Sequence, residues 1–179
     1  LTSQVDSLDF AIKRYGSKIF KPSLLDDVEF FDGASKIFGG KIVELEEIID
    51  GRLEKIKVSC KDHTHEADRF LVVRVYENMT ARAIIEDIKN TVLPAGFTTT
   101  NVNATAVINY IAFNYEQPSK CFQQLAELIG YDWYIDENKD IHFFAKSTAV
   151  APFELSDTNG NYVFNSLSIR RSVHNLRNT

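Results

Sequence analysis

Apolar and polar residues alternate along the first third of the chain, which is the period expected of β-strands with one buried face. The alternating positions are Leu8, Phe10 and Ile12, then Val28 and Phe30, and finally Ile56, Val58 and Cys60. Glycines favourable for tight turns stand between these runs, namely Gly16, Gly33, Gly39, Gly40 and Gly51. The pattern predicts short antiparallel strands over residues 1–69, and we favour a small barrel over a sandwich.

Residues 70–146 have a mixed pattern that predicts a separate α/β unit. A strand over 70–76 leads into a helix with Thr80 as its N-cap, and a second strand spans 107–115. The helical stripe consists of Ala81, Ile84, Ile85, Ile88 and Val92. Pro118 and Gly130 mark the ends of a second helix. Residues 131–135 and 140–144 predict a closing hairpin, and both helices are expected to cover one face of a small sheet.

The last segment, 147–179, contains spaced apolar residues that predict one or two further strands. These residues are Tyr162, Phe164, Leu167, Ile169 and Val173. We expect an α+β fold in which these C-terminal strands either return to the first barrel or start a second one. The chain begins at Leu1 without a methionine, so we interpret it as a fragment of a longer protein.

Composition narrows the function classes. A hydrophobic content of 44% over 179 residues is enough for a buried core, and no apolar run approaches the roughly 20 residues of a membrane span. A net charge of −5 argues against a general nucleic-acid binder. Cys60 and Cys121 are too few for a disulfide framework or a zinc site, and we expect buried free thiols.

Several local strings carry a resemblance to a known family. They are residues 27–33 with the Phe-Gly-Gly step at 38–40, the strand at 53–62 that ends in Cys-Lys-Asp, residues 76–85, and the helix and hairpin at 119–144. Together they resemble the tail hub or tail-tip proteins of tailed bacteriophages, a baseplate hub and tail-associated family related to the base of the type VI secretion spike. The resemblance covers residues 5–178. Its motifs consist of packing and turn residues, so it is specific for the fold and weak for any activity.

This resemblance implies a virion structural protein of a phage or prophage. Such a protein joins the tail tube to the distal spike or fibre, forms part of the DNA ejection channel, and has the tail tube or distal tail protein and the tape measure as partners. It implies a homotrimer in the full-length form, passage of DNA without specific binding, and a place in the virion tail after synthesis in the bacterial cytoplasm. We expect no enzymatic activity and no cofactor. The alternative is a monomeric module that binds a receptor or glycan at a tail tip or bacterial surface.

Two groups of residues are candidates for binding. The apolar residues Phe38, Ile42, Val43 and Leu45 can serve either the core or an assembly interface, and the sequence does not separate these roles. The aromatic residues Tyr131, Trp133 and Tyr134 can stack on a sugar ring. Because Tyr131 and Trp133 alternate with Ile135 on one strand face, packing beneath the helices is the favoured interpretation.

Polar clusters give no case for catalysis or metal binding. His63 and His65 lack a third ligand nearby, so we expect a solvated loop there; His142 and His174 are isolated. A glycosidase needs two carboxyls held apart in a cleft, whereas the four acidic residues of the hairpin are expected to crowd a solvated turn. They are Asp132, Asp136, Glu137 and Asp140. A second acidic run is expected on a solvated strand face, where it would repel DNA in a channel. It consists of Glu44, Glu46, Glu47 and Asp50.

Overall fold

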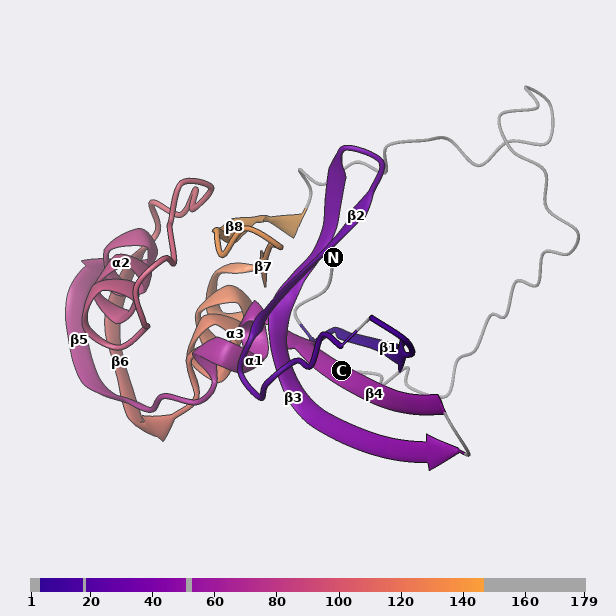
Figure 1. Ribbon diagram of the computed structural model, residues 1–179. Helices are drawn as coiled ribbons and strands as arrows, with labels where there is room; N and C mark the ends of the chain where they lie inside the picture. The colour runs from indigo at the N-terminus through magenta and orange to yellow at the C-terminus, as the bar shows by residue number, and fades with distance from the viewer. Residues whose placement is uncertain (1–3, 18, 51–52, 147–179) are drawn as a thin grey trace, which may run out of the picture. The chain divides into compact units, whose positions relative to one another are not determined.

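The computed structural model describes residues 4–17, 19–50 and 53–146, and its elements are drawn in Figure 1. The first four strands are β1 (Ser7–Arg14), β2 (Asp27–Asp32), β3 (Ser35–Asp50) and β4 (Leu53–Asp62). They form one antiparallel sheet in the order β1-β4-β3-β2, and the long strands β3 and β4 curl strongly (Figure 1). The expected α+β class is confirmed. Within the described residues this sheet is a half-barrel, open at its edge strands β1 and β2.

The inner face of the half-barrel carries the predicted period-two residues. In the register of β1 and β4, Leu8 pairs with Cys60 and Ile12 pairs with Ile56, so their side chains lie on the same face. A small core of four buried residues lies at the centre of this face: Ile42, Ile56, Val58 and Cys60. Around it are half-buried residues, namely Leu8, Ile12, Val28, Phe38 and Leu45. The half-barrel therefore buries the middle of its apolar face and leaves the margins partly exposed.

Gly39 and Gly40 do not form the turn that the sequence suggested, because both lie inside β3. Their lack of a side chain serves close packing instead. A Cβ at Gly39 would collide with the backbone carbonyl of Glu137, and one at Gly40 would collide with the carbonyl of Lys61. The real turn of this region is at Gly33, whose φ of 60° lies in the left-handed region.

Replacing Gly40 with alanine is expected to lower the free energy of unfolding by about 1 to 3 kcal/mol, because a backbone atom of the neighbouring strand must move to admit the new methyl group. The measurement is urea unfolding followed by circular dichroism. Gly33→Asn is the matched control, since asparagine tolerates the left-handed conformation and this turn has open space. Equal stability of the two variants would contradict the close packing of Gly40.

Residues expected in a solvated loop form a short buried helix, α1 (His63–Ala67), directly after β4. Its N-cap is Asp62, whose side chain accepts a hydrogen bond from the backbone N–H of His65 at 3.1 Å. His63, Thr64 and Glu66 are all at least 92% buried. The prediction of a solvated loop was wrong, because α1 packs between the half-barrel strands and the elements that follow.

The α/β unit follows the predicted order closely. It comprises β5 (Val72–Thr80), α2 (Ala81–Thr91), β6 (Val107–Glu116), α3 (Pro118–Ile129), β7 (Tyr131–Ile135) and β8 (Ile141–Ala145). The Thr80 hydroxyl accepts from the N–H of Ala83 at 3.2 Å, which confirms the N-cap. Gly130 ends α3 with φ 71°, as expected of a left-handed C-cap. The Asp68 carboxylate accepts hydrogen bonds from the backbone N–H and the hydroxyl of Ser119. It thereby gives a free N–H group in the first turn of α3 an acceptor.

The strands of this unit do not form one sheet. β5 pairs with β6 and β7 pairs with β8, giving two separate two-stranded ribbons. The loop that follows α2 adds to the second ribbon, because Thr98 and Val102 form parallel bridges with Asp140 and Phe143. The helical stripes predicted from the sequence, together with Trp133 and Phe143, form a large core between these elements. The predicted C-terminal strands of 147–179 lie outside the described residues.

Candidate functional site

The four predicted assembly residues lie on β3 but not on one face. Ile42 is 2% exposed and belongs to the core of the half-barrel, whereas Phe38 and Leu45 are half-buried beside that core. The register with β4 shifts between Ile42 and Glu44, so Val43 is the extra residue of a β-bulge. Ile42 is thus a core residue, Phe38 and Leu45 lie at the margin of the apolar face, and Val43 lines a separate cavity.

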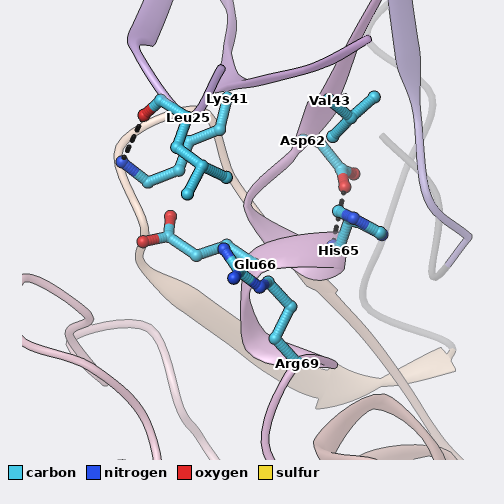
Figure 2. A pocket seen from close by; sticks show the side chains of 7 residues that line it. All are labelled: Leu25, Lys41, Val43, Asp62, His65, Glu66 and Arg69. Carbon is cyan, nitrogen blue, oxygen red and sulfur yellow. Dashed lines mark hydrogen bonds between the residues drawn. The ribbon is translucent and has the colours of Figure 1, made fainter.

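That cavity has a volume of about 180 Å³ and lies where β3 and the end of β4 meet α1 (Figure 2). Its lining residues are Leu25, Lys41, Val43, Asp62, His65, Glu66 and Arg69. Leu25 has φ 71° and is held by a hydrogen bond from its N–H to the carbonyl of Ile42 at 2.9 Å. The cavity therefore combines two apolar walls with charged groups of both signs.

Most of these charged groups already have partners within the fold. Lys41 donates to Asp27 at 2.7 Å. It also donates to the carbonyl of Leu25 at 3.5 Å, as Figure 2 shows. The hydrogen bond to Asp27 raises the pKa of Lys41 above its ordinary value, so the ammonium stays charged. Asp62 accepts from the N–H groups of Asp6 and His65. Burial raises the pKa of Asp62 above its ordinary value, although these hydrogen bonds oppose the effect. The contacts hold the segments around the cavity together.

Glu66 is the centre of a buried ionic cluster that the sequence did not reveal. Its carboxylate lies 2.9 Å from the Lys139 ammonium and 3.1 Å from Nδ1 of His63. The Lys139 ammonium lies 5.5 Å from the ring centroid of Phe97, which also meets His63 edge-on. Burial lowers the pKa of His63, although the hydrogen bond to Glu66 partly opposes this effect. Glu66 and Lys139 are 73 residues apart, so no local pattern could have indicated the pair.

His63 and His65, considered as metal ligands, have separate environments. His63 is buried against Glu66, while His65 lines the cavity beside Asp62. Within residues 4–17, 19–50 and 53–146, no group of three His, Cys, Asp or Glu side chains is arranged to hold a metal ion. Cys60 and Cys121 are free and buried, and burial raises the pKa of both thiols, to about 12 for Cys121.

The aromatic residues of the hairpin mainly serve packing. Trp133 is 3% exposed, its indole N–H donates to Gln123 at 3.0 Å, and its ring meets Phe122 edge-on. The buried indole packs against α3. Tyr134 is half-buried and stacks on His142 with ring centroids 4.4 Å apart. Glycan stacking by Tyr131, Trp133 and Tyr134 stays a prediction.

The acidic turn of the hairpin differs from the solvated cluster that we expected. Asp140 is only 7% exposed and accepts hydrogen bonds from Thr98, Thr100 and Asn101. Burial by itself would raise its pKa, but these hydrogen bonds outweigh that effect and hold the pKa below the ordinary 3.8. Asp140 is thus kept ionised by donors within the protein instead of by solvent.

On β3, Glu46 and Glu47 are exposed as predicted. Glu46 pairs with Lys57 at 2.8 Å and Glu47 pairs with Lys21 at 2.5 Å. Their negative charge is therefore partly neutralised by nearby lysines, which weakens the field that a channel wall would present to DNA.

Solved structures of tail proteins share this fold. The chain superposes on the 43 kDa tail protein of prophage MuSo2 from Shewanella oneidensis with a TM-score of 0.66 at 15% identity, and on a tail protein from Neisseria meningitidis with a TM-score of 0.62 at 14% identity. A component of the Escherichia coli type VI secretion system, described as similar to the bacteriophage T4 tail proteins gp27 and gp5, gives 0.60 at 16%. These matches cover 78%, 78% and 83% of this chain, but 46%, 41% and 45% of the other chains.

The chain therefore has the fold of phage and prophage tail proteins, which confirms the resemblance seen in its sequence motifs. It spans less than half the length of these solved proteins. No protein-family model and no curated protein matches it. In the described part of the chain, no helix is long and apolar enough to cross a membrane.

Proposed function

We propose that this chain is a structural module of a phage or prophage tail tip or baseplate hub, joining the tail tube to the distal spike or fibre and forming part of the DNA ejection channel. The fold shared with tail proteins supports this role. The observation that carries it is the open half-barrel, whose apolar inner face and two edge strands are incomplete in the described residues. Such a sheet is built to be completed by further strands.

The mechanism is one of geometry. Among the described residues, β1 and β2 are the edge strands of the sheet, and Phe10 and Phe30 on the same apolar face are 38% and 48% exposed. Burying these groups against neighbouring strands supplies both hydrogen bonds and apolar contact. We infer that other subunits of a full-length homotrimer supply such strands. Phe38 and Leu45 are the β3 residues placed to contribute.

The remaining partners follow from the same role. The tail tube or distal tail protein, the tape measure and the spike or fibre are the proteins that a tail hub contacts. DNA passes without specific binding, because a net charge of −5 gives phosphates no attractive surface. The place of action is the virion tail, after synthesis in the bacterial cytoplasm.

The role is tested by the mass of a version extended past Thr179, measured by light scattering on a sizing column over a concentration series. A stable trimer is expected, because the added chain completes the barrels that line a ring. An extended chain that stays monomeric at every concentration would refute the hub. Glycan-array binding by that monomer, lost on Tyr134→Ala, would then favour the receptor-binding alternative.

A further inference from the structure

One buried imidazole lies where helix α1 meets the turn between β7 and β8. His63, the first residue of α1, is 5% exposed, and its Nδ1 lies 3.1 Å from Oε2 of Glu66. The same carboxylate oxygen lies 2.9 Å from the Lys139 ammonium, which belongs to the turn. Glu66 therefore serves two groups at once, and its pair with Lys139 attaches the turn to α1. We call His63, Glu66 and Lys139 the His63 cluster.

The ring of His63 is placed to hold one proton and not two. Its only hydrogen bond among the described residues is the one through Nδ1, so in the neutral ring Nδ1 donates to Glu66 and Nε2 carries the lone pair. Nε2 faces β3 closely, since a Cβ built on Gly39 would lie 2.9 Å from it. A second proton would therefore place a charged donor at this contact, where the described residues give it no hydrogen-bond partner.

Charged groups of both signs face His63 from the elements packed against it, and most of them are already paired. The cavity of about 370 Å³ beside the ring is lined by charged residues of β2, β3 and the turn, namely Asp27, Glu29, Lys36, Glu137 and Lys139. Lys36 pairs with Glu29 at 2.6 Å, and Asp27 pairs with Lys41 at 2.7 Å. The Glu137 carboxylate accepts from the Asn138 amide at 3.1 Å. Within the described residues, Glu66 is the carboxylate that contacts the imidazole.

We propose that the attachment of the β7–β8 turn to α1 is acid-sensitive, and that protonation of His63 at mildly acidic pH releases it. A charged imidazole competes with Lys139 for the Glu66 carboxylate. The Lys139 side chain is 20% exposed, so the ammonium can exchange this carboxylate for water. The trigger is the proton itself, and the inference does not depend on the proposed role in a phage tail.

The direction of the pH effect follows from the protonation of the folded state. Burial lowers the pKa of His63 below the ordinary 6.5, the hydrogen bond to Glu66 opposes this effect, and the charge of Lys139 adds to it. The closed contact therefore binds the proton less readily than the open one does. The attachment is fully present above about pH 6.5 and weakens as the pH falls through the pKa of the folded state. The contribution of Asp140 is lost only below about pH 4, so the two effects are separate.

Amide hydrogen exchange of this chain, followed by NMR at pH 7.0 and pH 5.0, tests the proposal. The Asp68 N–H donates to a carbonyl of α1 at 3.0 Å, and the Thr98 N–H donates to the carbonyl of Lys139 at 3.0 Å. We expect the protection factors of both amides, corrected for the intrinsic rate at each pH, to be about tenfold lower at pH 5.0. Low concentrations of urea should leave this exchange unchanged, because a local opening exposes little surface.

Two asparagine variants separate His63 from its neighbour. His63→Asn keeps an N–H donor for Glu66 but cannot be protonated, so its protection factors should differ less than about twofold between the two pH values. His65→Asn is the matched control, because His65 lies two residues further along α1 and lines the other cavity. This control should retain the tenfold fall of the unmodified chain.

Several results would overturn the proposal. One is an equal fall in the unmodified chain and in His63→Asn, and another is a fall that disappears in His65→Asn. Exchange that accelerates steeply in low urea would show that the contact opens only when the whole chain unfolds. If circular dichroism shows that His63→Asn is unfolded, an NMR titration of the His63 ring in the unmodified chain decides the question. A midpoint at or above pH 6.5 would then refute the acid-sensitive attachment.

Discussion

Asp140→Ala is expected to lower the free energy of unfolding by about 3 to 5 kcal/mol, because Asp140 organises a whole loop through one buried carboxylate. Its oxygens accept from the Thr98 hydroxyl, from the Thr100 N–H at 2.8 Å, and from the N–H and side-chain amide of Asn101 at 3.1 and 2.8 Å. Removing the carboxylate leaves these donors without their acceptor. Urea unfolding followed by Trp133 fluorescence measures the loss.

The same carboxylate predicts a dependence of stability on pH. Its pKa in the folded protein lies below the ordinary 3.8, so the folded state binds the proton less readily than the unfolded state. The stabilisation is therefore fully present above about pH 4 and is lost as the pH falls below that value through the folded pKa. In Asp140→Ala the acid limb of the stability curve should become shallower.

Asp132→Ala is the matched control, because this aspartate lies in the same hairpin with a side chain 53% exposed and a distant ion pair to Lys146 at 3.8 Å. We expect Asp132→Ala to change the free energy of unfolding by less than about 0.5 kcal/mol. Similar losses in the two variants would show that Asp140 does not organise the loop, and an unchanged acid limb in Asp140→Ala would show that its pKa is not depressed.

Glu66→Ala is expected to lower the free energy of unfolding by about 3 kcal/mol. The substitution leaves the Lys139 ammonium, beside a buried histidine, without a counter-charge. Glu66 is 8% exposed, whereas the Lys139 side chain is 20% exposed, so we expect a loss at the lower end for buried ion pairs. Thermal unfolding of Glu66→Ala, Lys139→Met and the double variant forms a double-mutant cycle.

The cycle should show strong coupling, with the double variant more stable than the sum of the single losses predicts. Glu86→Ala provides the control, since its ion pair with Arg82 at 2.7 Å lies on the exposed surface of α2 and should contribute about 0.5 kcal/mol or less. Additive losses in the Glu66 and Lys139 cycle would indicate that the two charges are screened by solvent.

The contrast between α2 and α1 shows where sequence reasoning succeeds. The stripe Ala81, Ile84, Ile85 and Ile88 is fully buried, because an 11-residue amphipathic helix records its buried face in its own spacing. Helix α1 has five residues of polar composition, too few for a period to appear. Its burial depends on Lys139 and Phe97, which are distant in sequence.

The two glycines of β3 show a second limit. A Gly-Gly pair is typical of a turn, so the sequence suggested one at Gly39 and Gly40. The structure shows instead that the backbones of Glu137 and Lys61 approach these glycines closely. Likewise, the alternation of β5 indicated a strand, but only the pairing register showed that Val73, Val75 and Tyr110 share a face left open by the core.

By itself, the sequence determined the α+β class, the order of nearly all strands and helices, the caps at Thr80 and Gly130, and the resemblance to tail proteins. These properties depend on local periods and turn chemistry, which neighbouring residues encode. The tertiary structure decided the open half-barrel, the buried carboxylates of Glu66 and Asp140, and which apolar residues remain exposed for assembly. Each of those depends on contacts between segments far apart in the chain, which residue spacing along a single element does not specify.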